Sequence, residues 1–459
     1  MKTFGVLKKL KRKTGAEVFL VGGYVRDFIR KQKNTDLDVV VRKIGMLEIE
    51  TFLSAYGTVK FVTVSKELNQ VGILLFKAFN DDVEAQIALP RGKGYKFDSR
   101  NTLKGDAALR DFTINAMYLP IDYKSRKDII DFFHGYSHIK RRIILAVEDP
   151  NKRMRESPIR MLRAISLAAR TSYIIDKSVM DAIEKNKHLL KNVSYEAIQN
   201  ELNEILMCKK PSRYLKMMHR LGILNIVMPE LDACFGVQQD KKYHKYDVFK
   251  HCLYTCDHIE QDLVLRMAAL LHDIGKPSTM GRKGSRTTFH KHEVVSANLA
   301  TKFLNRLRYS KEFVHEVVHL IRLHMYHYTR DFSDGAVRKF IARAGITEED
   351  MHNLSDISLF KLRRAERLGN GYKKIAVTDR QRDFEKRLEK VYRESKGLHI
   401  SDLAVKGGDL IKIFSLEESP EIGEILRHLL EIVLEDPKQN TKAALIRFAA
   451  DYLANKRLE

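Results

Sequence analysis

Two aspartates with one residue between them are the first feature of this sequence that could carry chemistry. Asp36 and Asp38 stand at the start of the stretch LDVVVR, which reads as a β-strand. Strand residues two positions apart point to the same face of a sheet, so we expect the two carboxylates to lie together. Each would raise the pKa of the other unless a cation lay between them. Mg²⁺ takes one or two protein carboxylates and completes its shell with water and phosphate oxygens, so the pair is a candidate magnesium site.

A second feature precedes these aspartates and is suited to binding phosphate. Gly22 and Gly23 stand between a predicted strand, EVFLVGG, and a predicted short helix, YVRDFIRK. Glycines at such a junction let backbone N–H groups approach phosphate oxygens, and Arg26 could add its guanidinium. Together these residues predict metal-assisted attack of a 3′-hydroxyl on the α-phosphate of a nucleoside triphosphate, with pyrophosphate leaving.

The whole string, from the two glycines through Val-Arg-Asp to Asp-Leu-Asp-Val, resembles the signature of the nucleotidyltransferase superfamily that includes DNA polymerase β. Within it, the string is most similar to the class II branch, the bacterial CCA-adding tRNA nucleotidyltransferases and poly(A) polymerases. The resemblance implies that Asp36 and Asp38 are catalytic Mg²⁺ ligands and that Gly22, Gly23 and Arg26 bind the triphosphate. Glu84 falls on a strand where the family often carries one more acidic residue near the metals.

Two further motifs carry the resemblance along the chain. LRDFTINAMYLP resembles the family motif that approaches the incoming ribose, at Arg110, Asp111 and Asn115. A carboxylate and an amide suit this role because a 2′-hydroxyl is both a donor and an acceptor. RESPIRMLRAISLAAR resembles the motif that selects the base without a template, Glu-Asp-x-x-Arg. The residues at the corresponding helical spacing are Glu156, Ser157, Arg160 and Arg163.

Ser157 departs from the family pattern, which has aspartate there. Ser157 followed by Pro158 is also the pattern of a helix N-cap with proline at the first helical position. A hydroxyl can accept a hydrogen bond from a base amine, but without the strength of a charged acceptor. The resemblance implies template-independent addition of CMP and AMP, from CTP and ATP, to the 3′ end of tRNA. It leaves open a poly(A) polymerase, or an enzyme that adds only CC or only A.

A separate group of histidines lies in the second half of the chain. LVLRMAALLHDIGKP predicts an apolar helix that ends at His272 and Asp273, and His251, His292 and His324 lie within about 50 residues of this pair. The group resembles the HD superfamily of metal-dependent phosphohydrolases, whose closing Asp would be expected where this chain has Glu366. Imidazole and carboxylate ligands suit a second divalent metal such as Ni, Mn, Fe or Zn.

If active, this module would hydrolyse phosphomonoesters or 2′,3′-cyclic phosphates; if inactive, it would be a scaffold. A second alternative follows for the whole protein. The HD module could be the main hydrolase, acting on RNA ends or nucleotides, with the N-terminal region as an RNA-binding platform.

The elements that must position these residues change character along the chain. Up to about residue 145 the pattern is mixed: LDVVVR, VKFVTVS, GILLFKAF and VEAQIAL read as strands, and from there on apolar residues recur at helical spacing. Together with the resemblance, this pattern implies an α+β nucleotidyltransferase head with a polymerase β-like mixed sheet, followed by an all-α neck, HD domain and tail. The predicted domains are a catalytic head at 1–145, a neck for base selection and RNA binding at 146–231, the HD domain at 232–370, and a tRNA-binding tail at 371–459.

The composition of the chain predicts the kind of partner it binds and the cellular compartment in which it works. The chain has 459 residues, and its 82 Lys and Arg against 59 Asp and Glu give a formal net charge of +23, spread along the sequence. Such an excess favours a polyanionic partner, and the resemblance implies that this partner is tRNA. No apolar run is long enough to cross a bilayer, and the N-terminus lacks the pattern of a signal peptide, so we expect a cytoplasmic protein that does not bind membranes. The sequence leaves open whether the chain forms a homodimer.

Overall fold

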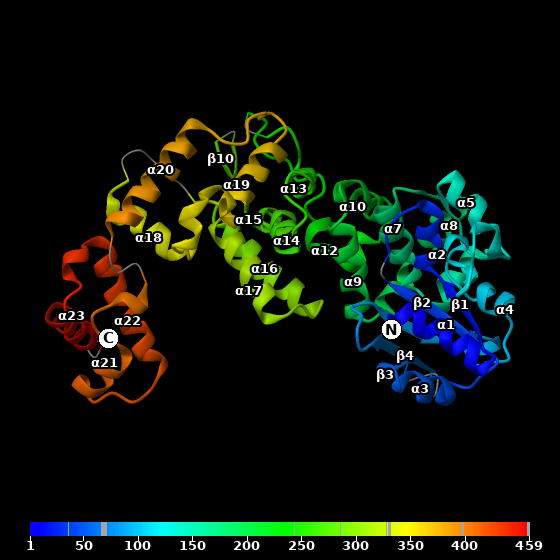
Figure 1. Ribbon diagram of the computed structural model, residues 1–459. Coiled ribbons are helices and arrows are strands. Elements are labelled where there is room, and N and C mark those ends of the chain that lie inside the picture. Colours follow the sequence, from blue (N-terminus) through cyan, green and yellow to red (C-terminus); the bar gives the residue numbers. More distant parts are fainter. Residues whose placement is uncertain are drawn as a thin grey trace. The chain divides into compact units, whose positions relative to one another are not determined.

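The structure is a computed structural model that describes residues 1–34, 36–65, 71–242, 244–284, 286–326, 328, 332–395 and 399–456. The chain divides into two compact units, Met1–Pro229 and Glu230–Glu459. Figure 1 labels the helices and strands of both units.

The N-terminal unit is built on a seven-stranded mixed sheet of strand order β3-β4-β5-β2-β1-β6-β7. Neighbouring strands are antiparallel except β2 and β5, which are parallel. The strands are β1 (Glu17–Val21), β2 (Leu37–Arg42), β3 (Gly57–Ser65), β4 (Val71–Ala78), β5 (Glu84–Ala88), β6 (Met117–Pro120) and β7 (Ile130–Asp131). The strands predicted between residues 17 and 89 are confirmed.

Helices cover this sheet and extend it into a helical region. Helix α1 packs against β1 and β4, and α2 packs against β1, β2 and β6. The helices of the unit are α1 (Thr3–Thr14), α2 (Gly23–Arg30), α3 (Met46–Ser54), α4 (Leu103–Ala108), α5 (Gly135–Arg141), α6 (Pro150–Glu156), α7 (Arg160–Thr171), α8 (Lys177–Asn186), α9 (Tyr195–Leu206), α10 (Pro211–Arg220) and α11 (Leu224–Val227); α12 (Pro229–Asp232) lies at the boundary of the units.

The core beside the first candidate site joins the sheet to α4. Val40 of β2 is buried in one cluster with Phe19, Leu103 and Tyr118. Because side chains alternate along a strand, Asp38 lies on the same face of β2 as Val40. This packing therefore fixes the backbone that carries Asp38.

The C-terminal unit is almost entirely helical. Its elements are α13 (Val248–Asp257), α14 (Leu263–Leu271), α15 (Lys276–Thr279), the hairpin β10 (Met280–Lys283) and β11 (Arg286–Phe289), α16 (His292–Arg306), α17 (Lys311–Leu323), α18 (Asp334–Ala344), α19 (Ser358–Gly369), α20 (Asp379–Glu394), α21 (Gly407–Phe414), α22 (Pro420–Glu435) and α23 (Lys442–Lys456). The hairpin β10–β11, and the short pair β8 (Ile143–Ile144) and β9 (Ile174–Ile175) of the N-terminal unit, were not predicted. Within the described residues, no helix is long and apolar enough to span a membrane.

Candidate functional site

The two carboxylates of the first site lie at the beginning of β2. Asp38 is the second residue of the strand, and Asp36 directly precedes it. Burial raises the pKa of Asp38 above its ordinary value, and the Asp36 carboxylate adds to this shift, against the opposing charges of Arg110 and Arg26. A raised carboxyl pKa in a cleft lined by cations is the electrostatic signature of a site that a divalent ion would stabilise.

Gly22 brings the backbone close to this pair. Its φ of 68° and ψ of −132° lie in a region that only glycine adopts readily. A Cβ atom at Gly22 would lie 2.9 Å from Asp38 Oδ2. Helix α2 begins at the next residue, Gly23, so the start of a helix lies beside the carboxylates. The predicted phosphate-binding turn and the predicted metal ligands are thus in contact.

Arg26 is held rigidly by its neighbours. Its Nε and Nη2 donate to the two carboxylate oxygens of Asp27 at 3.0 and 2.7 Å, and its Nη1 donates to Asn115 Oδ1 at 3.0 Å. Asn34 and Arg30 also donate to Asp27, both at 2.9 Å. Asp27, which the sequence analysis did not single out, therefore orders Arg26 for any anion that enters the site.

Asp106 has the same role for two other arginines. This residue of α4 is 1% exposed, and its carboxylate accepts from Arg91 Nε at 2.8 Å and from Arg110 Nη2 at 2.9 Å. Tyr118 Oη also donates to it, at 2.5 Å. Burial alone would raise the pKa of Asp106, but the Arg110 and Arg91 guanidinium groups hold it well below its usual value. Arg110 had been predicted; Asp106 and Arg91 had not.

These residues surround a cavity of about 580 Å³. Within the part of the chain that the structure describes, its lining brings together most of the residues predicted for nucleotide transfer, namely Gly22, Gly23, Arg26, Asp36, Asp38, Arg110, Asp111, Asn115, Arg160 and Arg163. It adds Asp27, Arg30, Lys33, Asn34, Arg91 and Arg170. Glu84, Glu156 and Ser157 are not among these lining residues. Glu84 is exposed at the beginning of β5, and its role near the metals stays a prediction.

The segment predicted to read the base is broken into two helices. Ser157 follows the last residue of α6, and α7 begins only at Arg160, so the predicted role of Ser157 as an N-cap is wrong. Ser157 instead accepts a backbone hydrogen bond from Arg160 N at 3.0 Å. Proline at 158 tolerates the turn because it has no N–H to satisfy. Glu156 and Arg160 still meet across the break at 3.3 Å.

Arg160 and Arg163 lie in different surroundings. Arg160 is 5% exposed and donates to the carbonyls of Leu109 at 2.7 Å and Arg153 at 3.2 Å. Arg163 lies within 3.4 Å of Asp111 and 3.2 Å of Glu201, a residue of α9 that the sequence did not indicate. Glu156 accepts from Tyr95 Oη at 2.7 Å. The Arg163 side chain is 42% exposed and that of Arg160 is 6% exposed, so Arg163 is the more accessible of the two.

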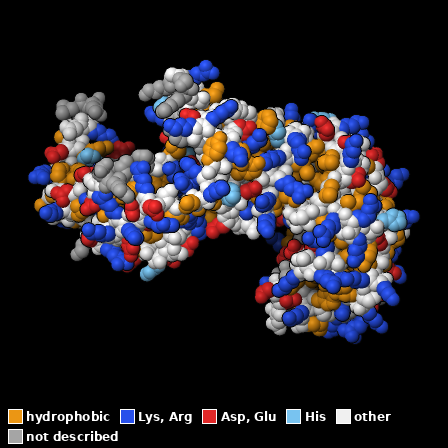
Figure 2. All heavy atoms as spheres, turned by 90° about the horizontal axis from the view of Figure 1, so that it is seen from above, with side chains coloured by type: hydrophobic (Ala, Val, Ile, Leu, Met, Phe, Trp, Pro, Cys, Tyr) orange, Lys and Arg blue, Asp and Glu red, His pale blue; other side chains and the backbone are white. Residues whose placement is uncertain are grey.

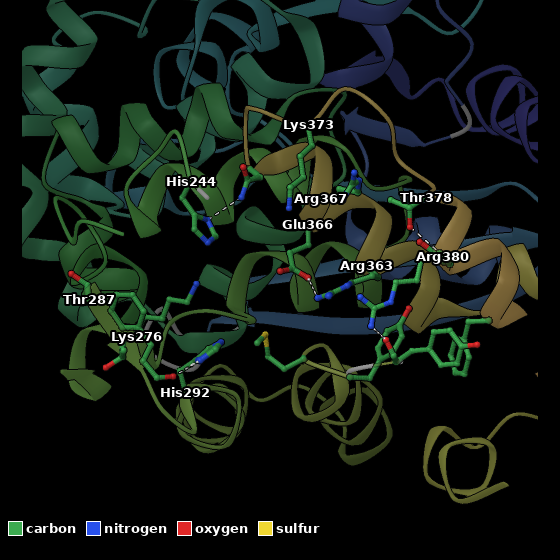
Figure 3. Close-up of a pocket in the computed structure, with 18 residues that line it drawn as sticks. His244, Lys276, Thr287, His292, Arg363, Glu366, Arg367, Lys373, Thr378 and Arg380 are labelled. Atoms are coloured by element: carbon green, nitrogen blue, oxygen red, sulfur yellow. Dashed lines mark hydrogen bonds and ion pairs between the residues drawn. The ribbon is translucent and has the colours of Figure 1, made fainter. Parts of the chain in front are cut away.

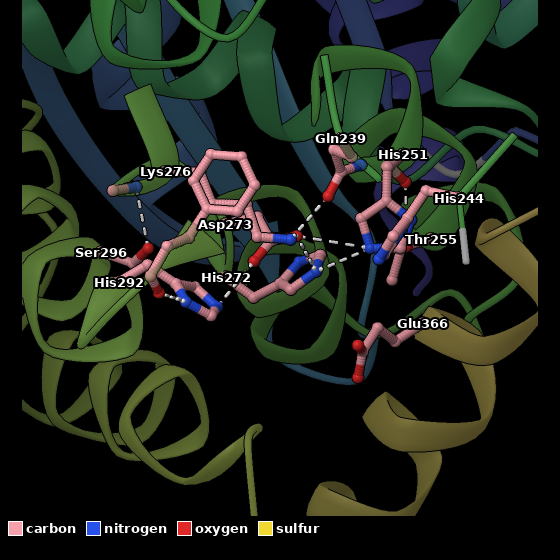
Figure 4. A network of polar contacts seen from close by, with 12 residues as sticks. Gln239, His244, His251, Thr255, His272, Asp273, Lys276, His292, Ser296 and Glu366 are labelled. Carbon is pink, nitrogen blue, oxygen red and sulfur yellow. Dashed lines mark hydrogen bonds and ion pairs between the residues drawn. The ribbon is translucent and has the colours of Figure 1, made fainter. Parts of the chain in front are cut away.

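Four histidines of the second unit form one buried cluster around Asp273, and Figure 4 shows three of them, His251, His272 and His292. Helix α13 contributes His251 and the start of α16 contributes His292, whereas His272 and His324 directly follow the last residues of α14 and α17. The Nε2 atoms of the four rings lie between 3.2 and 3.8 Å from a carboxylate oxygen of Asp273. All the predicted HD-site residues are thus brought together.

Glu366 of α19 completes this cluster. One carboxylate oxygen of Glu366 and one nitrogen each of His251 and His272 lie within 4.8 Å of one another. Burial would raise the pKa of Glu366, but Arg363 and the neighbouring histidines lower it to about 2. Burial lowers the pKa of His251 to about 3 and that of His324 to about 4. The carboxylate is thus charged and these two rings neutral at pH 7, as metal ligands must be.

Three buried atoms of the cluster support the same interpretation. His292 Nε2, His324 Nε2 and Asp273 Oδ1 make no well-aligned hydrogen bond with the residues that the structure describes, and His292 Nε2 and Asp273 Oδ1 lie 3.2 Å from each other as an ion pair. Buried polar atoms of this kind are expected to have a partner, and a bound cation would supply one. The chemistry of the donor set therefore fits a divalent metal.

Two residues beside the cluster were missed by the sequence analysis. Lys276, 6% exposed, donates to Asp273 Oδ2 at 2.7 Å and to Gln239 Oε1 at 2.8 Å. His244 lies against the His251 ring, with centroids 5.5 Å apart, and its Nδ1 is 3.1 Å from Asn370 Nδ2. The HDIGKP string contained Lys276, but no local pattern pointed to His244.

Three family models match separate parts of this chain. The poly A polymerase head domain matches residues 18–145, the RNA- and SrmB-binding site of polymerase A matches 172–235, and tRNA nucleotidyltransferase domain 2 matches 291–449. Among solved structures, the Bacillus stearothermophilus CCA-adding enzyme in complex with CTP superposes with a TM-score of 0.65 at 18% identity, covering 100% of this chain and 98% of that one. This likeness establishes the fold.

Curated relatives are more similar in sequence. The multifunctional CCA protein of Herminiimonas arsenicoxydans is 31% identical over 64% of this chain and 69% of its own length, and that of Methylobacillus flagellatus is 30% identical over 63% and 69%. The CC-adding tRNA nucleotidyltransferase of Thermus thermophilus is 26% identical over 94% of both chains. With the carboxylate pair, the glycine turn and the ribose motif in one cavity, these matches show that the chain belongs to the family of bacterial-type CCA-adding tRNA nucleotidyltransferases.

Proposed function

We propose that this protein adds CMP and AMP to the 3′ end of tRNA without a template, completing or repairing the CCA sequence. The observation that carries the proposal is the cavity of about 580 Å³ that joins Asp36 and Asp38 to Gly22 and Arg26. Its volume is in the range that suits a small ligand such as one nucleoside triphosphate. Carboxylates for a metal and cations for a triphosphate are the two requirements of nucleotidyl transfer.

Asp36 and Asp38 would hold Mg²⁺, and the raised pKa of Asp38 supports this assignment. When bound, the ion supplies charge neutralisation and activates the attacking 3′-hydroxyl. Arg26, Arg110 and the turn at Gly22 would bind the phosphates, and the Asp27 and Asp106 carboxylates keep these arginines in fixed positions. Preordered donors of this kind stabilise the charge that develops on the leaving pyrophosphate.

Asp111 and Asn115 would recognise the ribose, and the region around Arg160 and Arg163 would recognise the base. Arg160 already donates to two backbone carbonyls, whereas Arg163 is 42% exposed in its side chain. Ser157 offers a hydroxyl where the family has a carboxylate. We infer that base discrimination rests more on Arg163 here than on the residue at position 157.

The charge of the surface agrees with an RNA substrate. Figure 2 shows Lys and Arg side chains over the whole visible face, among fewer acidic ones. The formal net charge of +23 would bind the tRNA backbone through contacts that do not depend on base sequence.

The test is extension of tRNA transcripts that lack CCA, end in C, or end in CC, with each NTP alone and with CTP and ATP together. We expect CTP to be added twice, and ATP once after CC. Extension that stops at CC, or addition of ATP to ends that carry CC with no addition of CTP to the shorter ends, would reassign the protein as a partial enzyme. A long ladder of adenylates would make it a poly(A) polymerase.

A second function is favoured by the buried cluster of the C-terminal unit. We propose that His251, His272, Asp273, His324 and Glu366 hold a divalent metal, with His292 beside them, and that this site hydrolyses phosphate esters. The supporting observation is the set of buried atoms without a well-aligned hydrogen bond, His292 Nε2, His324 Nε2 and Asp273 Oδ1, within the described residues. When bound, such a metal lowers the pKa of a coordinated water and makes it nucleophilic.

Metal content and hydrolysis can be measured separately for this site. We expect one equivalent or more of Ni, Mn, Fe or Zn in the full-length chain after equilibrium dialysis, and loss of most of it in His272→Ala. Hydrolysis of 2′,3′-cyclic AMP should disappear in the same variant, whereas Asp38→Asn should retain it. Retained metal in His272→Ala would refute the site.

A further inference from the structure

A carboxylate that pairs with an arginine can lie in the wall of a cavity or behind it. In a cavity of about 640 Å³ beside the buried histidine cluster, Glu366 belongs to the lining together with its partner Arg363, as Figure 3 shows. In the first cavity, Arg91 and Arg110 line the wall, whereas their shared partner Asp106 is not among the described lining residues. Asp106 therefore acts on a ligand of the first cavity through its two arginines.

The two carboxylate oxygens of Asp106 have different partners. Oδ1 accepts from the backbone N and the Nε of Arg91, at 3.0 and 2.8 Å. Oδ2 accepts from the Nε and Nη2 of Arg110, at 3.0 and 2.9 Å, and from Tyr118 Oη at 2.5 Å. Arg110 Nε also donates to Tyr118 Oη at 3.2 Å. A hydroxyl and a guanidinium thus meet at one oxygen, so the position of the hydroxyl helps to set that of the guanidinium.

Tyr118 is the part of this arrangement that the sheet holds in place. It is fully buried in β6, which pairs with β1 on one side and β7 on the other. Its ring packs edge-on against Phe19 of β1, with centroids 6.4 Å apart. Asp106 instead lies in the short helix α4, and Arg110 lies in the segment that follows this helix. The sheet therefore fixes the hydroxyl of Tyr118, and the hydroxyl fixes Oδ2 of Asp106.

The hydroxyl of Tyr118 keeps its proton and donates it to Asp106. Burial raises the pKa of Tyr118 well above its ordinary value, and the Asp106 carboxylate adds to this shift, against the opposing charge of Arg110. Tyr118 is also not among the described residues that line the first cavity. A hydroxyl in this position does not exchange a proton with a nucleotide, and its contribution is the direction that it gives to the carboxylate.

We propose that Tyr118 is a positioning residue for nucleotide addition: its hydroxyl fixes the Asp106 carboxylate, and this carboxylate holds the Arg110 guanidinium where it binds the triphosphate. The proposal rests on the function proposed above, which assigns phosphates to Arg110. An arginine that is ordered before the nucleotide arrives loses less side-chain entropy on binding. Its planar fork of donors also keeps the orientation that suits phosphate oxygens.

Tyr118→Phe tests the hydroxyl alone. The substitution keeps the ring, which packs against Phe19 and lies 5.3 Å from the Arg110 guanidinium. Tyr214→Phe is the matched control, because Tyr214 is a buried tyrosine of α10 that is not among the described lining residues of the cavity. KM and kcat are measured for CTP addition to a tRNA that lacks CCA, and urea unfolding measures the stability of each variant.

We expect Tyr118→Phe to raise KM for CTP by about tenfold, the range for a hydrogen bond to a charged group. A variant that only folds less well would have fewer active molecules, which lowers kcat and leaves KM unchanged. A rise in KM therefore marks the positioning role, and Tyr214→Phe should keep the parental KM. Because Tyr118 acts through Asp106, adding Tyr118→Phe to Asp106→Asn should change KM by less than about twofold.

Three results would overturn the proposal: a parental KM in Tyr118→Phe, an equal rise in KM in Tyr214→Phe, or increases in KM that multiply in the double variant. Binding of CTP to the full-length chain without tRNA, measured by calorimetry, separates this proposal from the function on which it rests. A parent that adds CMP and binds CTP no more tightly than Tyr118→Phe refutes the positioning role alone. A parent that binds CTP about tenfold more tightly than this variant but adds no nucleotide refutes the function and supports the role of Tyr118 in binding.

Discussion

Gly22 offers a sharp test of the contact between the glycine turn and the carboxylate pair. In Gly22→Ala, the new Cβ would lie 2.9 Å from Asp38 Oδ2, a distance at which one of the two must move. The backbone at φ 68° and ψ −132° would also be strained. Backbone strain of this kind costs about 1–3 kcal/mol. A carboxylate displaced by about 1 Å would lower the rate of nucleotide addition by about a hundredfold.

Gly15 provides the matched control, because it has a similar φ of 71° but nothing within 4 Å of its Cβ position. Gly15→Ala should lose about 1 kcal/mol of stability from the left-handed backbone and keep its activity. Urea unfolding measures stability, and single-turnover addition of CMP to a tRNA that lacks CCA measures the chemical step. If Gly22→Ala adds CMP at the parental rate, the turn does not constrain Asp38 and the reasoning fails.

Three further predictions concern other parts of the chain. Asp106→Asn removes the charge that holds Arg110 in position, so KM for CTP should rise by about tenfold or more in steady-state assays. An unchanged KM would show that Arg110 keeps its position without the Asp106 charge. Ser157→Asp should leave the ratio of kcat/KM for CTP and ATP unchanged, because Ser157 is not among the described residues that line the cavity and cytosine and adenine both carry an amino group; a changed ratio would show that position 157 contacts the base. The pKa of His324 is lowered to about 4, chiefly by burial. Folding therefore disfavours its proton, so stability is full above pH 6.5 and falls as the pH drops towards 4, by about 2 kcal/mol at pH 5. Urea unfolding in EDTA should show a smaller loss between pH 7.5 and 5 in His324→Asn than in the parent, and an equal loss would contradict the low pKa.

Features that depend on local spacing could be predicted from the sequence. The alternation of LDVVVR placed Asp38 on one face of a strand, and the apolar period before His272 placed that residue at a helix end. The resemblance to known families then indicated which distant segments, such as those of His251 and His324, would meet. These signals sufficed for most of both candidate sites.

Features that depend on contacts between distant residues could not be predicted. Asp106 accepts a hydrogen bond from Arg91, which precedes it by 15 residues. Gln239 accepts one from Lys276, which follows it by 37 residues. Nothing near either residue marks these pairings. At Ser157 the local signal was ambiguous, since Ser-Pro can begin a helix or separate two, and here the chain turns between α6 and α7.

The central claim is that Asp36 and Asp38 together hold the metal that drives nucleotide transfer. The most direct measurement is pyrophosphate release from CTP with a tRNA that lacks CCA, titrated with Mg²⁺, for the parent, Asp36→Asn and Asp38→Asn. We predict that each substitution lowers the rate by at least about a hundredfold, and that binding of the tRNA is unchanged. Release that continues at the parental rate in either variant would contradict the account.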